Sequence, residues 1–392
     1  MSIGVAILGL AVLILLHEAG HFFVARAVGM RPRKFYLGFP PALVKTTRGG
    51  IEYGIGAIPL GGYVKIPGMH RPAAGDLRAS LTPAQQQEHT QELDVLDAAL
   101  AREDETAART QLAALEPELG KNRILQEQLD ALSPDAYWRQ KTWKRIAVIG
   151  AGPGTNIVIA LVLFVIVFMS ASLTLTRTVH SVLKGHPAAA AGLKAGDQIV
   201  DVAGRSVAPD GLQTAINGTH GHPFTLVVIR NGHRITLGPL KAQLQDGSYR
   251  VGFVIGTKKG PGQSLSSAVG SSLHLTRSIT TGTLNGIWGL THGQGTHNVS
   301  SVVGIVRDTA QAYRASFQDY VYFVGAISLV LALANLLPLL PFDGGHIVMS
   351  ALEGVRHRAF SQLAYMRYSA VGMVVFMFLL YLGLRNDVTS GG

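Results

Sequence analysis

Four stretches of the chain consist almost entirely of apolar residues, at about 3–28, 146–170, 320–340 and 368–384. Each approaches or exceeds the roughly 20 residues that an α-helix needs to cross the hydrocarbon core of a bilayer. The polar regions between them are long enough for one small domain and one helical insert. The pattern therefore predicts an α-helical polytopic membrane protein with four transmembrane helices.

The region after the first apolar stretch alternates between apolar and polar residues and is punctuated by glycine. We expect short strands at 34–39, 51–55 and 58–66, forming a membrane-associated β-hairpin region. Strand edges near a membrane must be covered by protein or line a cavity. Such an edge could bind an extended peptide by β-addition, or the hairpin could serve only for packing, and the sequence leaves both open.

Residues 80–134 are rich in Gln, Glu, Ala and Leu, and their leucines recur at a spacing of three or four. This spacing is typical of amphipathic helices, which we expect to break near Pro117 and Pro134. The region is predicted to form a helical hairpin or short coiled coil, acting either as a spacer or as an arm that docks a partner.

A third polar region, 178–257, resembles a bacterial PDZ domain. Pro187 to Leu193 would form its short helix, Gly196-Asp197 a turn and Ile199 to Val202 the next strand. Residues 224–237 read as a hairpin through Asn231-Gly232, the strongest short hairpin signal. A PDZ domain binds extended peptides in a groove, but here it could also act as a gate that blocks access by size.

These patterns divide the chain into six parts. A membrane helix with β-hairpins is followed by a cytoplasmic helical insert, a second membrane helix, an extracytoplasmic α+β PDZ domain, juxtamembrane extracytoplasmic helices and a final pair of membrane helices. The expected bounds are 1–75, 76–137, 138–175, 176–258, 259–319 and 320–392.

Composition supports the membrane assignment, because only 15% of the residues are charged and the mean hydropathy is +0.27. The net charge of +10 does not indicate nucleic-acid binding. The insert is acidic, and much of the positive excess lies beside the spans, at Arg26, Arg31, Arg33, Lys34, Lys45, Arg139, Lys141, Lys144, Arg145, Arg356, Arg358 and Arg367.

The positive-inside rule then assigns residues 27–145 and 345–367 to the cytoplasm, and both termini and residues 171–319 to the outside. The first apolar stretch lacks a basic leading segment, so we expect no cleavable signal peptide. The aromatic residues Tyr137, Trp138 and Trp143 are expected at the membrane interface before the second span.

The first apolar stretch contains the box His17-Glu18-Ala19-Gly20-His21. Residues four apart share a helix face, so His17 and His21 can offer two imidazoles to one metal while Glu18 lies beside it. Ionisable groups at membrane depth are energetically expensive and favour a function. With no cysteine in the chain, histidine and carboxylate side chains remain as ligands for a zinc ion.

Further polar residues lie in the other spans. Asn156, within the small-residue run 150–156, requires a hydrogen-bond partner inside the membrane. The third span ends in a segment with two prolines, Pro338 and Pro341, which break a helix, and Asp343 offers a carboxylate just beyond them. His292 and His297 could form a second metal site, although loop histidines are commonly just solvated.

Together these motifs resemble the site-2 protease family of intramembrane zinc metalloproteases, and within it the single-PDZ relatives of regulator of sigma-E protease. The resemblance rests on the His-Glu-x-x-His box, Gly61-Gly62-Tyr63-Val64-Lys65, residues 145–156, the PDZ-like segment and Asn335 to His346. It covers nearly the whole chain except the acidic insert. Phe342 stands where the family usually has leucine, which affects packing beside Asp343.

The resemblance implies that His17, His21 and Asp343 hold Zn²⁺, that Glu18 activates water and that Asn335 helps to hold substrate or the oxyanion. His346 would then be a neighbouring polar group. Cleavage of a membrane helix requires local unwinding, and strand pairing along 58–66 is a plausible way to hold the unwound segment. Substrate contacts are accordingly expected at Gly61, Gly62, Tyr63 and Asn156.

The expected function is cleavage, in the bacterial inner membrane, of single-pass proteins already trimmed outside by a site-1-type protease, such as anti-sigma factors, and of remnant signal peptides. Two alternatives differ in class. An ion transporter should show internal pseudo-repeats, and none is visible between the two halves of the chain. A catalytically inactive PDZ membrane scaffold would tolerate loss of Glu18 or a ligand, yet every motif position is filled.

Overall fold

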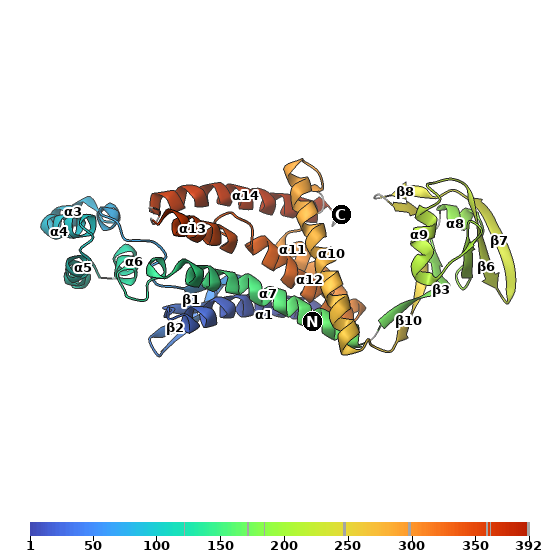
Figure 1. Ribbon diagram of the computed structural model, residues 1–392, viewed down its shortest axis with the longest axis horizontal. Coiled ribbons are helices and arrows are strands. Elements are labelled where there is room, and N and C mark those ends of the chain that lie inside the picture. The colour runs from blue at the N-terminus through green and yellow to red at the C-terminus, as the bar shows by residue number, and fades with distance from the viewer. Residues whose placement is uncertain are drawn as a thin grey trace. The chain divides into compact units, whose positions relative to one another are not determined.

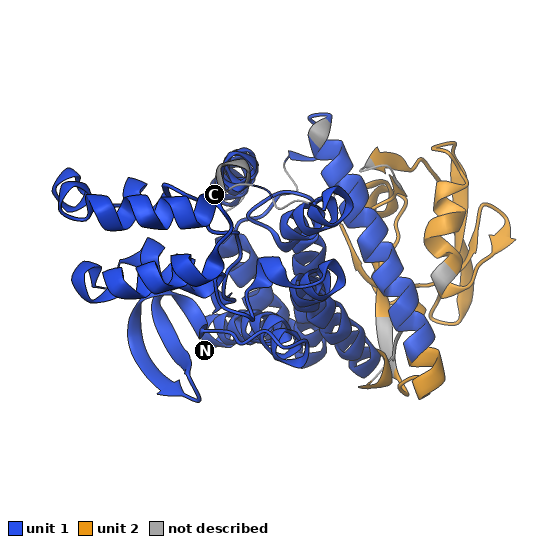
Figure 2. Cartoon of the chain, turned by 60° about the vertical axis from the view of Figure 1, so that its left-hand side comes forward, with its two compact units in different colours: residues 1–167, 269–392 blue, residues 168–268 orange. Residues whose placement is uncertain are grey.

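The computed structural model describes residues 1–392 except 121, 171, 184, 246–247, 297–298, 358–359, 361 and 390–392. The chain divides into two compact units, one made of residues 1–167 and 269–392 and the other of residues 168–268 (Figure 2). His297 and Arg358, both named above, lie outside the described residues.

Unit 1 contains four described helices that are long and apolar enough to cross a membrane, which confirms the four predicted spans. They are α1 (Ser2–Ala27), α7 (Thr142–Ser170), α12 (Phe317–Asn335) and residues 365–388 of α14 (Gln362–Thr389). The third span was predicted too far along the chain. Its helix ends at Asn335 rather than near residue 340, because Pro338 and Pro341 follow within two turns.

Two further helices lie between unit 2 and α12 in the chain, and one lies between α12 and α14. α10 (Leu265–Thr291) and α11 (Val302–Ala315) occupy the region expected to hold juxtamembrane helices, and α11 packs against α1 and α12. α13 (Asp343–Arg356) begins directly after the break in the third span.

Helices α1 and α7 lie side by side (Figure 1). A Cβ atom added at Gly20 of α1 would lie 2.4 Å from the hydroxyl oxygen of Thr155 and 2.6 Å from the carbonyl oxygen of Ala151, both on α7. A larger residue would therefore push the two helices apart. This close approach brings the His-Glu-x-x-His turn of α1 against the glycine-containing segment of α7.

The β region consists of two long strands, β1 (Lys34–Arg48) and β2 (Ile51–Lys65), rather than the three short strands predicted from the glycines. Both strands bend. Residues 34–37 pair with residues 62–65 on one side and with residues 52–55 on the other. The bends occur at irregularities in the register around Gly38 and Pro40-Pro41, where strand continuation could not be read from the sequence.

The insert is a small bundle with its own leucine core, rather than a two-helix hairpin or coiled coil. Its helices are α2 (Asp76–Ala79), α3 (Pro83–Glu88), α4 (Thr90–Ala101), α5 (Glu105–Leu119) and α6 (Arg123–Ala131). We expected Pro117 to break the helix, but it lies within the last turn of α5. There it removes one backbone hydrogen bond while Leu115 holds the helix in the core.

Helix α6 ties the insert to the β region. Asp130 forms two ion pairs, one with Arg33 before β1 at 3.0 Å and one with Lys65 at the end of β2 at 2.8 Å. Asp135 also pairs with Arg33, at 3.1 Å. Asp130 at the end of α6 thus binds the residue before β1 and the last residue of β2, which are neighbours at one end of the ribbon.

The short helix η1 (Tyr137–Arg139) leads into α7. Tyr137 is buried and its hydroxyl bonds to that of Ser350, so it is not the membrane-interface anchor that we predicted. Arg145 is likewise buried and paired with Glu353 of α13 instead of serving as a surface charge. Trp143, by contrast, is exposed.

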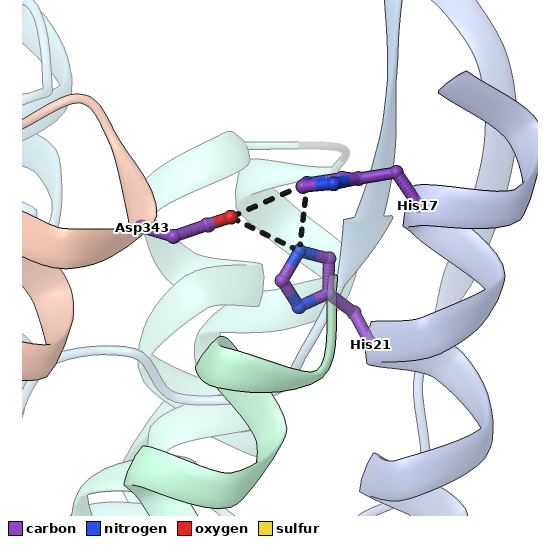
Figure 3. Close-up of side chains that lie close together, drawn as sticks. All are labelled: His17, His21 and Asp343. Carbon is purple, nitrogen blue, oxygen red and sulfur yellow. Dashed lines mark hydrogen bonds and ion pairs between the residues drawn. The ribbon is translucent and has the colours of Figure 1, made fainter. Parts of the chain in front are cut away.

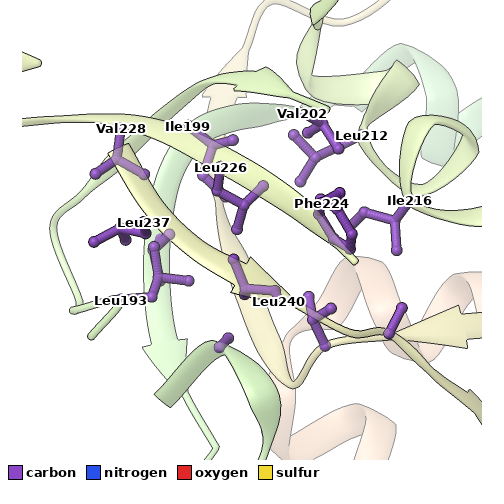
Figure 4. Packing of buried hydrophobic residues seen from close by; sticks show 14 of the residues in the cluster. Leu193, Ile199, Val202, Leu212, Ile216, Phe224, Leu226, Val228, Leu237 and Leu240 are labelled. Atoms are coloured by element: carbon purple, nitrogen blue, oxygen red, sulfur yellow. The ribbon is translucent and has the colours of Figure 1, made fainter. Parts of the chain in front are cut away.

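Unit 2 holds a six-stranded sheet in which β10, β3, β4, β6 and β7 follow one another and β5 pairs with β4. Its elements are β3 (Ser172–Val182), α8 (Pro187–Ala190), β4 (Gln198–Val202), β5 (Arg205–Ser206), η2 (Pro209–Gly211), α9 (Leu212–Asn217), β6 (Phe224–Arg230), β7 (His233–Leu240), β8 (Gln243–Gln245), β9 (Ser248–Arg250) and β10 (Phe253–Gly260). The buried side chains of these elements form one core (Figure 4).

The predicted strand at 199–202 and the hairpin through Asn231-Gly232 are confirmed. Asn231 and Gly232 both have positive φ, as this two-residue turn requires. The helix predicted from Pro187 to Leu193 is shorter and ends at Ala190, because Gly192 turns the chain with φ of +81°. The sheet also extends beyond the expected bounds of 176–258, beginning at Ser172 and ending at Gly260.

Candidate metal centre

Three predicted ligands meet in unit 1. His17 and His21 project from successive turns of α1, and Asp343 projects toward them from the start of α13 (Figure 3). The Oδ2 atom of Asp343 lies 3.2 Å from Nε2 of His17 and 3.4 Å from Nε2 of His21, and the two nitrogens are 3.3 Å apart. Among the described residues this is the one such group of potential ligands.

The size of this triangle fits a zinc ion. Ligands at 2.0–2.1 Å from a tetrahedral centre lie about 3.3–3.4 Å from one another, which matches the three distances between the donor atoms. Both histidines are buried, with 7% of each residue exposed. The donor set of two imidazoles and one carboxylate is also that of a catalytic zinc with one position left for water.

The hydrogen bonds around the triangle point to the same conclusion. The Nδ1 atom of His21 donates to the carbonyl oxygen of Val148 at 2.8 Å, which orients the ring so that Nε2 faces Oδ2 of Asp343. In a neutral imidazole with this bond, Nε2 keeps its lone pair and can bind a metal. A cation between the two imidazoles and the carboxylate would compensate the buried carboxylate oxygen.

Gly152 of α7 forms one wall of the centre. A Cβ atom there would lie 2.3 Å from Nε2 of His21 and 2.7 Å from Nε2 of His17. The position must therefore remain glycine for both imidazoles to reach Asp343. In the sequence Gly152 was only one of several small residues in a membrane span, and no spacing rule singled it out.

Glu18 lies beside the ligands and against β2. The backbone of Val64 lies near its carboxylate. A Cβ atom at Gly62 would lie 2.8 Å from Cγ of Glu18, so this strand approaches the acid closely only because residue 62 has no side chain. Gly61 has φ of +130°, a conformation that favours glycine.

The turn that carries Asp343 is equally tight. A Cβ atom at Gly344 would lie 2.3 Å from the carbonyl oxygen of Leu336, and one at Gly345 would lie 2.4 Å from the backbone nitrogen of Leu340. The two glycines let α13 start directly against the end of α12. Asn335 is the last residue of α12 and so lies at this same break.

Asn156 does not find the side-chain partner that we expected. It is fully buried on α7, and neither amide atom has a hydrogen-bond partner in the described structure. Its backbone carbonyl accepts a hydrogen bond from the hydroxyl of Ser328 at 2.9 Å. The sequence could identify the polar group but not its surroundings.

The other candidate histidines do not extend the centre. His346 lies outside the ligand group, and its ring packs 6.2 Å from that of Tyr365. His292 bonds to the carbonyl of Trp288, and no second cluster of ligands occurs in the described part of the chain.

Comparison with known proteins agrees with this geometry. The profile of Peptidase family M50 matches residues 5–380, so the chain belongs to this family, that of the site-2 proteases. Zinc metalloprotease Rip1 of Mycobacterium tuberculosis is 29% identical over 90% of this chain and 86% of its own. The putative zinc metalloprotease Atu1380 of Agrobacterium fabrum is 27% identical over 98% of this chain and 94% of its own. The probable protease eep of Enterococcus faecalis is 26% identical over 96% of this chain and 96% of its own.

The protein is therefore a zinc metalloprotease. Its four apolar helices agree with a membrane protein that crosses the bilayer several times.

Proposed function

We propose that the chain is an intramembrane zinc endopeptidase in which His17, His21 and Asp343 hold the metal and Glu18 is the general base. The observation that carries this proposal is the convergence of the three donor atoms, from a helix long enough to cross the membrane and from the break after another. When bound there, zinc would lower the pKa of a water toward about 7 and would polarise the scissile carbonyl.

Glu18 then handles the proton. Its carboxylate takes a proton from the attacking water and delivers it to the leaving amine, so that each peptide bond broken consumes one water. The backbone of Val64 near the carboxylate and the close approach of β2 at Gly62 would limit the orientations open to Glu18. These neighbours support proton transfer, rather than metal binding, as the role of Glu18.

The edge of β2 next to Glu18 supports a mode of substrate binding. Residues 62–65 pair with β1 on one side, and no strand pairs with their other edge in the described structure. An unwound substrate segment could add there as a strand, with Gly61 and Gly62 leaving room for its backbone. Tyr63, stacked on Tyr36 at 5.2 Å between ring centres, would hold the edge in place.

Two asparagines complete the proposed site. Asn335 at the end of α12 would hold the substrate carbonyl or the oxyanion. Asn156, buried and without a side-chain partner, would contact substrate or a reoriented neighbour. Either role would give these amides the partners that a polar group in a membrane protein requires.

Substrates would be single-pass proteins of a bacterial inner membrane, such as anti-sigma factors first trimmed by a site-1-type protease, and remnant signal peptides. Residues 176–258 would form an extracytoplasmic PDZ domain that acts as a gate, with residues 27–145 in the cytoplasm. The strand order of unit 2 and its hairpin through Asn231-Gly232 support the PDZ assignment.

The test uses a single-pass model substrate with a short outer tail, incubated with the purified chain in detergent. We expect cleavage within its membrane segment, located by mass spectrometry, and loss of cleavage with Glu18→Gln. Cleavage only outside the membrane segment, or cleavage that survives Glu18→Gln in a zinc-loaded protein, would contradict the proposal and favour a scaffold or transporter.

A further inference from the structure

A cleft of about 400 Å³ lies between the end of β2 and helix α6 of the insert. Its walls include Val64 and Lys65 from β2, His70 from the connection that follows, Asp76 from the start of α2, and Ile124 and Gln128 from α6. All of these residues belong to unit 1. The insert therefore does more than extend away from the membrane helices, because it closes one side of a cavity.

The cleft borders the proposed cleavage site at Val64. This residue lines the cleft, and its backbone lies near the carboxylate of Glu18. A chain paired with the edge of β2 advances about 3.3 Å per residue, so its next residues would enter the cleft.

Gln128 offers an acceptor on the cleft wall. The residue is 4% exposed, and its Nε2 donates to the carbonyl of Ala73 at 3.4 Å. Its Oε1 is buried and has no donor in the described structure. A buried amide oxygen without a donor is costly, and an N–H group of a bound chain would satisfy it.

The charges of the cleft are balanced. Lys65 pairs with Asp130 at 2.8 Å, and Arg123 pairs with Glu127 at 2.8 Å. The remaining lining charges are one basic and one acidic residue, Arg71 and Asp76. Such a cleft has no excess charge to attract a nucleotide or another anion, whereas its unpaired acceptor suits a peptide main chain.

We propose that this cleft is a substrate subsite: it binds the flank of the substrate chain on the side of the helical insert, next to the segment held by β2. The inference rests on the proposed function. It assigns the insert to substrate docking rather than to spacing. Gln128 accepts a main-chain hydrogen bond from the flank, remote from the bond that is cleaved.

A kinetic experiment tests the subsite with two forms of the model substrate, one with the flank and one truncated directly after its membrane segment. Gln128→Leu removes the acceptor and keeps a similar volume. For the flanked substrate we expect KM to rise about five- to tenfold, the effect of one hydrogen bond, with kcat nearly unchanged. The truncated substrate has no flank to bind, so its KM should be raised to the same extent with the wild-type and the Gln128→Leu proteins.

Gln126→Leu is the matched control, because Gln126 lies on the same helix but bonds to Glu116 outside the cleft. It should leave KM unchanged for both substrates. An equal effect of Gln128→Leu on both substrates would overturn the proposal, since the loss would then be structural.

A binding experiment separates this inference from the proposed function. The photoreactive residue p-benzoylphenylalanine replaces Ile124 in the Glu18→Gln protein, and the flanked substrate is added. We expect cross-links to the flank, and none when the photoreactive residue is at position 126. Absence of flank cross-links while the wild-type chain still cleaves would overturn the subsite alone, whereas absence of any cleavage would overturn the proposed function.

Discussion

Gly152 is the residue on which the metal centre makes the strictest steric demand. Substitution by alanine would place a methyl carbon 2.3 Å from Nε2 of His21. Either α7 or the imidazole would then have to move. We predict that Gly152→Ala lowers zinc affinity about 10- to 100-fold, the range found when ligand positioning is disturbed. Zinc titration monitored by recovered cleavage measures this.

Gly154→Ala is the control for this change, because a Cβ atom there has no neighbour within 4 Å. It should behave as wild type. Equal zinc affinity of the two alanine variants would show that α7 does not confine the imidazoles.

At this scale the sequence predicts the three proposed ligands but not the residues that position them. His17 and His21 follow from helical spacing, whereas Asp343 needed the resemblance to a family as well as the proline break. Gly152, Val148 and Val64 could not be predicted, because their roles depend on contacts between segments distant in the chain. Asn156 shows the same limit, since the sequence indicates that its amide needs a hydrogen-bond partner but not that the described structure provides none.

At the scale of elements, Asp197 joins two parts of unit 2. Its carboxylate accepts hydrogen bonds from Arg230 of β6, at 2.7 Å, and from the backbone of Lys194, at 2.8 Å. The hydrogen bonds from Arg230 hold the pKa of Asp197 below its usual value. A lowered pKa stabilises the fold above the usual carboxyl range, and this contribution is lost as the pH falls through the folded-state pKa.

We predict that Asp197→Asn destabilises unit 2 at pH 7 by about 1–3 kcal/mol, and that the difference from wild type shrinks below about pH 4. Hydrogen exchange of the β4 amides in the full chain, corrected for intrinsic rates at each pH, measures this. Asp201→Asn on β4 serves as the comparison. If the stability lost in Asp197→Asn were the same in acid as at pH 7, the result would argue against a charge-assisted interaction between Asp197 and Arg230.

The elements themselves were predicted where periodicity is strong and missed where tertiary contacts override it. The spans and the hairpin through Asn231-Gly232 follow from local pattern. The bent strands β1 and β2 do not, because prolines and glycines within them read as breaks. Tyr137 and Arg145 resembled interface residues, yet their partners, Ser350 and Glu353, lie on a helix some 200 positions away.

At the scale of the whole molecule, the gate proposed for unit 2 makes a prediction about substrate size. Replacing residues 173–260 by a Gly/Ser linker should allow cleavage of single-pass substrates that still carry a large outer domain. Substrates with a short outer tail should be cleaved as before. Comparing the two substrates with the intact and shortened chains measures the effect, and loss of all cleavage in a zinc-loaded shortened chain would indicate recruitment instead of gating.

The central claim is that three residues from α1 and α13 hold one catalytic zinc. Zinc per chain, measured by mass spectrometry on detergent-purified wild type, Glu18→Gln and Asp343→Ala, tests it most directly. We expect about one zinc in wild type and in Glu18→Gln, and a sharply lower content in Asp343→Ala, because Asp343 supplies a ligand and Glu18 does not. Full zinc content in Asp343→Ala would contradict the account.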